Sequence, residues 1–566
     1  MTTTYNHMAM PRILDIPELL DTIFSFMTDE DNVANARVCK RWSNVALDVL
    51  WRELHDLRPL LHLFAPFDST RVSIRFSRPL LPDDWKRFDK YSCRVRRLIV
   101  DSKTNLESYV NPEVFDEIAR TRPRLEILPR LNTLSWGLSV SASVVFMHKN
   151  IKHFEITLPI DMIHARFKPS AFLPSISARM PNLESLSIFT DISMKVIEEE
   201  ACALIRSLPK LKKINTPRFY FTTRVAEELA RLSDLGVIEF ESPNAYIEDI
   251  EIRGPADIRD FAPKLEDGAF PSLYDFSSCL PFTIAADSFE NVFPPRNLTA
   301  LYLDSPDFEE SASFARIISV VADNCPLLER LTLNSFVQAR ESSFEPPPES
   351  GPGLDFDALR PILRMPNLTY LELHHHFPFD ISVKQMEELA SKWPSLETLI
   401  LNNDPLPHDG TRQPLPLEAL MPFARLCPRL KLLGLYLDAT VPTLPLALDA
   451  VPFKALETLS VGVSPITDSG AVALFLSKLC PLGCELEKGV TWQETEHEGV
   501  GEDVACICAA WKKVEELLPL LTKMRMEERE RTRQLKAEVE DLRMRTDVLM
   551  AKLPPATKDA LGCTPF

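Results

Sequence analysis

The segment PNLTYLEL, residues 366–373, decides the fold, because its spacing of leucines returns many times along the chain. The pattern is Pro, any residue, Leu, two residues, Leu, one residue, then Leu or Ile. It is kept at residues 181–188, 326–333, 394–401 and 428–435, with looser copies near residues 129, 209, 298 and 456. The first leucines of successive copies, such as Leu368, Leu396 and Leu430, are 28 and 34 residues apart.

This pattern predicts a short strand in every copy. The last two leucines are two residues apart, so they point to one face of an extended chain. The proline ends a preceding helix because it lacks an N–H and its ring disfavours a helix interior. Helical spacing of apolar residues between the copies, at 194–208, 314–322 and 383–392, predicts one helix per unit.

The repeated phrase resembles the leucine-rich repeat, whose period is of this order. The resemblance implies an α/β solenoid in which a curved parallel sheet carries helices on its outer face. The concave inner face of such a sheet is the expected surface for binding another protein. Near the end, ITDSG at residues 466–470 and the Cys480-Pro481 close resemble the cysteine-containing form of the repeat.

The usual polar ladder of that repeat is incomplete. Three residues after the last strand leucine, members usually carry Asn or Cys, which bonds to neighbouring backbone. This chain instead has Asp191, Phe336, His376, Asp404, Asp438 and Ser464 at those places. We therefore expect an irregular solenoid.

Composition excludes several classes of protein. The 566 residues carry a formal net charge of −18, which argues against nucleic acid or an anionic membrane as the main partner. We see no basic and apolar leader and no run of about 20 apolar residues that would span a bilayer. Eleven scattered cysteines then read as reduced thiols. We expect a cytoplasmic or nuclear protein.

Residues 12–57 differ from the rest of the chain. They begin with IPELLDTIFSFM at residues 16–27, in which Pro17 and Glu18 suit the start of a helix. A polar break at 28–31 leads to a second helical run that contains Val33, Ala36 and VCKRW at 38–42 and ends at VLWR, residues 49–52, within the segment LWREL at 50–54. Helical spacing alone would fit any small bundle.

Together, however, these groups resemble an F-box, a module of three helices. The resemblance implies docking on the small linker subunit of an SCF-type ubiquitin ligase, built on a cullin scaffold, with the solenoid presenting a protein substrate. By the same resemblance the linker-subunit contacts are Ile16, Pro17, Leu19, Leu20, Ile23, Val38, Cys39 and Trp42. Some of these must also serve the core of the module. A ligase-independent repeat scaffold is the alternative.

The remaining domains follow from changes of composition. We expect a connector or irregular first repeats at 58–125, and the solenoid at 126–484 with an exposed Pro-rich loop at 337–361. An acidic loop at 485–503 precedes helices within 504–552 and a tail at 553–566.

Alternation along the strands selects candidate substrate-binding residues on the inner face of the sheet. These are Tyr302, Asp304, Thr332, Asn334, Glu372, His374, Asn402 and Tyr436. The identity of the substrate is not encoded in this pattern. The net negative charge slightly favours a basic partner, because long-range attraction between opposite charges brings the two proteins together.

Signatures of catalysis are absent from the sequence. The glycine pairs at 351/353 and 499/501 lack the context of a phosphate loop. Cys480/Cys484 and Cys506/Cys508 lack the paired spacing of a zinc site. The run of His374, His375 and His376 has no carboxylate or Cys at ligand spacing, so a polar patch at a strand end is favoured over a metal site. We predict a non-catalytic adaptor with no cofactor and no metal.

The last helical segment has two parts. Apolar residues from Val504 to Leu521 recur on one face, as a capping helix needs, and Pro519 should kink or restart the helix. From residue 523 to 552, Leu535, Leu542 and Leu549 are seven apart in a highly charged stretch. Two heptads are fewer than a coiled coil usually shows, so we favour a solvated helix.

Overall fold

The fold comes from a computed structural model. It describes residues 16–68, 73–100, 110–158, 169–190, 192, 194–241, 256–293, 295–335, 354–405, 414–440, 451–490 and 502–552. The chain divides into two compact units, residues 1–306 with 341–344, and residues 307–340 with 345–566.

The first unit begins with three short helices, α1 (Pro17–Ser25), α2 (Asp29–Asn35) and α3 (Lys40–Arg52). The prediction of a polar break between helices at residues 28–31 is wrong, because α2 begins at Asp29. Thr28 accepts a hydrogen bond from the Asp31 N–H at 3.3 Å, and acidic side chains in the first turn suit the positive end of the helix dipole. The second helical run is therefore two helices.

These helices enclose a small core of their own. Leu20 and Phe24 on α1 are buried against Val45 and Ala46 on α3. Trp42 packs edge-to-face on Phe24 with ring centroids 5.3 Å apart. The apolar residues of α1 thus split into a buried stripe and a stripe that this core does not use.

The module continues directly into the parallel sheet. Strand β1 (Glu53–Leu54) pairs in parallel with β2 (Arg97–Val100), and the Arg96 N–H donates to the Arg52 carbonyl at 2.9 Å. Trp51 also packs on Tyr91 with centroids 4.8 Å apart. Between these strands and the next lie α4 (Arg58–Leu61), α5 (Pro82–Ser92) and α6 (Pro112–Thr121).

The remaining described strands of the first unit pair in parallel in the order of the sequence. They are β3 (Thr133–Trp136), β4 (His153–Leu158), β5 (Ser185–Thr190), β6 (Lys213–Pro217), β7 (Val237–Glu241), β8 (Asp275–Cys279) and β9 (Ala300–Asp304). Burial alternates along them, so one face carries the leucines of the repeat and the other carries polar residues.

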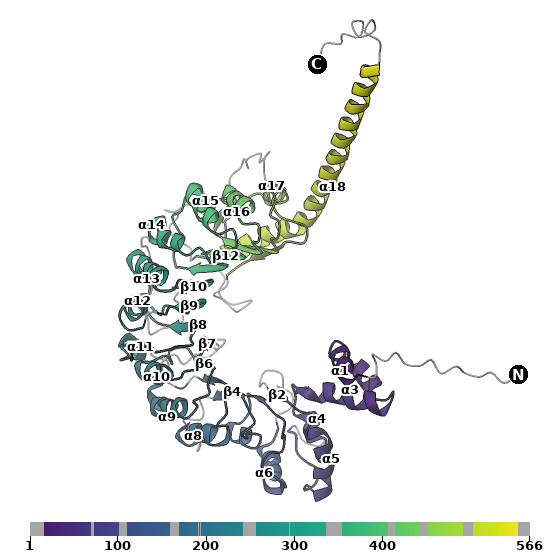
Figure 1. The fold of residues 1–566 in the computed structure, drawn as a ribbon, viewed down its shortest axis with the longest axis vertical. Coiled ribbons are helices and arrows are strands. Elements are labelled where there is room, and N and C mark those ends of the chain that lie inside the picture. Colours follow the sequence, from purple (N-terminus) through teal and green to yellow (C-terminus); the bar gives the residue numbers. More distant parts are fainter. Residues whose placement is uncertain are drawn as a thin grey trace, which may run out of the picture. The chain divides into compact units, whose positions relative to one another are not determined.

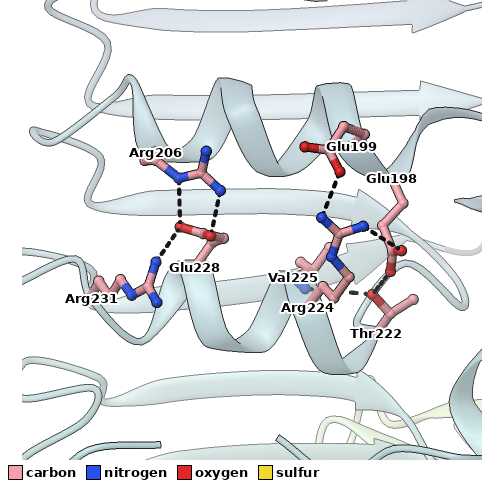
Figure 2. A network of polar contacts seen from close by, with 8 residues as sticks. All are labelled: Glu198, Glu199, Arg206, Thr222, Arg224, Val225, Glu228 and Arg231. Carbon is pink, nitrogen blue, oxygen red and sulfur yellow. Dashed lines mark hydrogen bonds and ion pairs between the residues drawn. The ribbon is translucent and has the colours of Figure 1, made fainter. Parts of the chain in front are cut away.

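Helices cover the leucine face of these strands (Figure 1). They are α7 (Val140–Ser143), α8 (Pro169–Arg179), α9 (Met194–Arg206), α10 (Thr223–Leu229), α11 (Ala256–Arg259) and α12 (Phe282–Asn291). Neighbouring helices are tied by ion pairs: Glu228 on α10 accepts from Arg206 on α9 at 2.6 Å and from Arg231 at 3.0 Å (Figure 2). These pairs link successive repeats on the outer surface.

The second unit repeats the scheme. Its strands pair in parallel in the order β10 (Arg330–Asn334), β11 (Tyr370–His374), β12 (Thr398–Leu401), β14 (Leu432–Leu435), β16 (Thr458–Gly462) and β17 (Glu485–Lys488), with β13 (Leu415–Pro416) and β15 (Leu437–Asp438) as a separate short pair. The covering helices are α13 (Ser311–Asn324), α14 (Phe356–Leu359), η4 (Arg360–Arg364), α15 (Val383–Lys392), η5 (Leu417–Ala419), α16 (Leu420–Leu426) and α17 (Ser469–Leu476). The predicted α/β solenoid with an N-terminal helical module is confirmed.

Polar side chains bond neighbouring repeats together, and of those named here only Ser464 stands at an expected ladder position. Asn182, Asn297 and Asn367 lie in the turn before a strand, and each donates to a backbone carbonyl of the preceding turn at 3.0 to 3.3 Å. After the strands, Asn402 accepts from the His375 N–H at 3.0 Å, and Ser464 accepts from the Leu437 N–H at 2.8 Å. The ladder exists, but its members are displaced along the sequence.

Two boundaries differ from expectation at the C-terminal end. Residues 485–488, expected in an acidic loop, form β17, because Leu486 is buried while its backbone extends the sheet beyond β16. Helix α18 (Glu502–Lys552) runs through Pro519 without restarting. Pro519 is exposed, so its ring lies away from the packed face of the helix.

Several expectations fall outside the described residues. They concern residues 12–15, most of the loop at 337–361, Asp191 and Phe336, the segment 491–501 and the tail at 553–566. In the part of the chain that the structure describes, no helix combines the length and the apolar character needed to cross a bilayer.

Candidate functional site

The strongest candidate for a binding surface is an exposed apolar stripe on the three N-terminal helices. Its members are 39 to 86% exposed although all are large and hydrophobic. They are Ile16, Leu19, Ile23, Phe26 and Met27 at α1, with Val33 on α2 and Val38 before α3. Exposed apolar residues that gather on one face mark interaction sites, whereas singly scattered ones need no explanation.

The helical period explains why this stripe is exposed. Ile16, Leu19, Ile23 and Phe26 follow one another at three or four residues and so share a face of α1. Leu20, one position over, is fully buried in the core of the module. Pro17 at the first turn pre-sets the helix without an N–H to satisfy.

The structure places the predicted linker-subunit residues in two groups. Ile16, Pro17, Leu19, Ile23, Val38 and Cys39 are exposed and available to a partner. Leu20 is buried and Trp42 is half-buried against Phe24, so both serve the core of the module. Phe26, Met27 and Val33 are also exposed but were not among the predicted residues. Phe26 and Met27 stand three and four residues after Ile23, so helical spacing could have indicated them, whereas Val33 lies on another helix.

The polar face of the sheet is the second candidate. Of the eight residues predicted there, five are half-buried, as expected for a polar face with room for a partner. These are Tyr302 in the first unit and Asn334, Glu372, His374 and Tyr436 in the second.

The other three predicted positions are buried. Asp304 forms an ion pair with Arg218 at 2.8 Å within the first unit. Thr332 is 7% exposed. Asn402 has a φ of 48°, and its amide bonds to the His375 N–H and to the Phe377 carbonyl, the latter at 2.7 Å. At Asp304 and Asn402 alternation selected residues that hold the fold, since both stand at the end of a strand, where the chain turns inward.

Glu372 is the centre of a polar network on β11. It accepts hydrogen bonds from Tyr370 and from His374 Nε2, the latter at 2.8 Å, and His374 Nδ1 lies 3.8 Å from Asp404. Burial by itself would raise the pKa of Glu372, but the bonds from His374, Tyr370 and Thr332 hold that pKa below its usual range. Burial and the neighbouring carboxylate raise the pKa of Tyr370. Glu372 is therefore held as a carboxylate in contact with His374.

The histidine run does not form a metal site. His375 and His376 are both fully buried, and His375 bonds to the Glu309 carbonyl at 3.1 Å and to the Phe377 backbone. Of the three histidines, His374 alone joins the polar face, so the polar patch expected of this run is formed by one of its members. Among the described residues, no group of three His, Cys, Asp or Glu side chains is arranged to hold a metal.

The buried cysteines behave as small hydrophobic residues. Burial raises the pKa of Cys325 and of Cys427 to about 12, so neither is a thiolate near neutral pH. A thiol is a good nucleophile only as its thiolate. These two buried side chains therefore pack as small apolar groups.

Comparison with known families identifies the N-terminal module. Residues 17–56 match the F-box-like family model, and this range covers α1, α2, α3 and β1. No protein in a search of curated sequences matches the chain.

Among solved structures, a match is found with a structural-genomics target from Bacteroides fragilis. The identity is 14%, the TM-score is 0.23, and the match covers 54% of this chain and 66% of that protein. A likeness this distant carries no argument about function.

Proposed function

The F-box-like domain at residues 17–56 supports a role in F-box-mediated protein interaction, and we propose that the protein is the substrate-recognition subunit of an SCF-type ubiquitin ligase. In this proposal the stripe of Ile16, Leu19, Ile23 and Phe26 docks on the linker subunit, which joins the chain to a cullin scaffold. The repeats hold a protein substrate. The chain acts by bringing a substrate lysine close to the charged ubiquitin carrier, which is catalysis by proximity.

The exposed apolar stripe carries this proposal. The module has its own core in Leu20, Phe24, Val45 and Ala46, so the stripe is not needed for folding. Leaving such residues in water has no benefit for an isolated chain, because each buried apolar side chain would contribute about 1.5–3 kcal/mol. A partner that covers the stripe explains why it is kept apolar.

The contacts between the module and the first repeats suit an adaptor that must keep the two in a fixed arrangement. Arg94 donates to the Asn44 carbonyl at 3.0 Å and pairs with Asp48, both on α3. The contact of Trp51 with Tyr91 lies beside it. Since several bonds join the module to the repeats, we expect it to move with the first repeats as one body.

For substrate binding we propose the half-buried polar residues of the strands. Glu372, held as a carboxylate by His374 and Tyr370, is pre-organised to accept a hydrogen bond from a basic side chain. This favours a substrate segment that presents Lys or Arg to the second unit.

Co-purification with the linker subunit tests the docking step. We expect the full chain to bind it, and a Leu19→Asp/Ile23→Asp variant to bind at least tenfold more weakly, since truncating a central anchor usually costs about 2 kcal/mol or more. Both side chains are 41% exposed, so the substitution should leave the module folded. Circular dichroism checks that it does.

Val196→Asp on α9 is the matched control, because Val196 is an exposed apolar residue outside the module. It should bind as the unmodified chain does. Binding that survives the double substitution would remove the proposed surface. A full chain that never binds the linker subunit would leave the ligase-independent scaffold as the better function.

A further inference from the structure

The C-terminal half of α18 carries an apolar stripe that the rest of the described chain does not cover. Its hydrogen bonds to other elements end with Arg525, which donates to Ser477 at 2.7 Å, and Arg529, which donates to the Lys478 carbonyl at 3.4 Å. Beyond Arg529, the ion pairs found within the described residues, Arg533 with Glu530 and Arg545 with Asp541, join α18 to itself. Figure 1 shows this half extending away from α17.

The stripe has the spacing of a coiled-coil seam. Leu535, Leu542 and Leu549 are seven apart, and the positions between them, four residues after each preceding leucine, are Val539 and Thr546. The leucines and Val539 are 47 to 65% exposed. From Glu528 to Leu549 the seam would be about 32 Å long at 1.5 Å per residue.

The same seven-residue phase begins in the docked half of the helix. Trp511, Val514 and Leu518 are buried against the repeats of the second unit and occupy the positions that lead, in steps of seven, to Thr532 and Leu535. Between the docked part and the free part, the same positions are held by Arg525 and Glu528, so the helix is continuous but its apolar seam is not. The free seam therefore consists of the residues that follow Glu528.

A lone helix of this composition has little to stabilise it. Isolated helices are marginal in water, and most helical stability in proteins comes from packing an apolar face. Leucines that recur every two turns on an otherwise charged helix therefore indicate that a partner helix packs against them. The residues at the core positions of the seam indicate which helix this partner is.

We propose that the protein forms a parallel dimer through residues 528–549 of α18, with a second copy of this chain as the partner. Leucine at one core position and valine or isoleucine at the other favour two-stranded parallel pairing. Val539 fits this rule, and Thr532 and Thr546, which are β-branched but polar, hold the equivalent positions between the leucines. In that pairing each core residue meets its own counterpart.

Charge at the flanking positions agrees with this orientation. In a parallel pair, Glu538 of one copy faces Arg543 of the other, which is an attractive contact on both sides of the seam. One heptad earlier, Arg531 faces Lys536, a like-charge contact that weakens the pair. The dimer should therefore dissociate on dilution.

This dimer goes beyond the proposed ligase role and does not depend on it, since no residue of the F-box-like module takes part. If both hold, one assembly would present two modules and two repeat surfaces.

Sedimentation equilibrium of the full chain over a range of concentrations tests the dimer. We expect the unmodified chain to shift from monomer to dimer, and Leu535→Glu/Leu542→Glu to need at least tenfold more protein for the same shift. Met544→Glu/Val548→Glu is the matched control, because these residues are 56 and 55% exposed on the same helix but lie off the seam. The control should dimerise as the unmodified chain does. A chain that stays monomeric throughout, or seam and control variants that behave alike, would overturn the proposal.

Charge reversal tests the orientation. Glu538→Lys should weaken the dimer because it places a lysine against Arg543 of the other copy. Adding Arg543→Glu should restore the attraction and the dimer. Circular dichroism of each variant checks that the helix content is unchanged. Failure of the second substitution to rescue the first would exclude the parallel arrangement.

Discussion

Glu184 lies in the turn before β5, between two lysines from neighbouring repeats. Its carboxylate accepts from Lys152 at 2.6 Å and from Lys212 at 2.8 Å. The hydrogen bonds from Lys152 and then Lys212 lower the pKa of Glu184 to about 2. The carboxylate thus ties three successive repeats together at one end of their strands.

We predict that Glu184→Gln lowers the free energy of unfolding at pH 7 by about 1 kcal/mol or less, because partly exposed ion pairs rarely contribute more. The pKa is lower in the folded state than the value of about 4.3 expected when unfolded. The contribution is therefore complete above that value and is lost as pH falls from about 4.3 towards 2. Urea unfolding at pH 7 and pH 3 should show the difference between the two proteins shrinking with acid.

Glu200→Gln on α9, away from the strand ends, is the control for this pH effect. It should leave the unfolding midpoint close to that of the unmodified chain at both values of pH. An equal difference between Glu184→Gln and the unmodified protein at pH 7 and pH 3 would argue against the ion pairs as its cause.

Individual residues also show where sequence reasoning reaches its limit. Asn402 was selected for the substrate face by alternation, yet its positive φ and two buried hydrogen bonds make it part of the scaffold. A period of two residues holds only while the strand continues, and β12 ends at Leu401. The direction of the next side chain is set by tertiary bonds that the pattern does not contain.

Among the elements, those with a strong local signal were predictable. The helix expected at 383–392 matches α15, because Ser382 and Gln385 form a capping box at its start. By contrast, the start of α2 was predicted as a polar break, because its first residues are polar and its stability comes from Thr28, the acidic first turn and packing on α3. β17 was missed for a similar reason: one buried leucine between charged residues gives no periodic signal.

The exposed stripe on α1 was only partly predictable. The family resemblance indicated a docking helix, and helical spacing separates Leu20 from Leu19 and Ile23 on a helical wheel. Which of the two faces is buried depends on α3, whose Val45 and Ala46 meet Leu20 and Phe24. That choice is tertiary, so sequence could not divide the anchors between core and surface.

Helix α18 closes the end of the repeats through one dominant residue. Trp511 is fully buried, and its indole N–H donates to the Ser464 carbonyl at 2.8 Å. We predict that Trp511→Ala costs about 3–5 kcal/mol of the stability of this end, from lost burial and the cavity left behind. Hydrogen exchange should rise in α17 and in the first half of α18.

Two further variants separate burial from the hydrogen bond. Trp511→Phe keeps most of the apolar volume and should cost less, about 1–3 kcal/mol, because the buried carbonyl of Ser464 loses its donor. Lys512→Ala, at the exposed neighbouring position, should leave exchange unchanged. If Trp511→Ala left exchange in α17 unaltered, α18 could not be the cap.

At the scale of the whole molecule, the F-box-like module also covers the first edge of the sheet. A boundary at residue 57 was expected from composition, yet β1 lies before it and pairs Leu54 with Leu98 of β2. An open edge strand exposes unpaired N–H and C=O groups and is a template for association with other chains. The module and the repeats are therefore joined through backbone pairing as well as sequence.

We predict that removing the module at two different points will have opposite consequences for association. A chain that begins at Trp51 keeps β1 and the contact with Tyr91, and should stay as dispersed as the full chain. A chain that begins at Arg58 bares the edge of β2 and should form higher oligomers in light scattering. Both are made with Leu535→Glu/Leu542→Glu, so that pairing through α18 does not contribute. Neither truncated chain should bind the linker subunit. If the chain that begins at Arg58 stayed dispersed, shielding the edge of β2 would not be a role of the module.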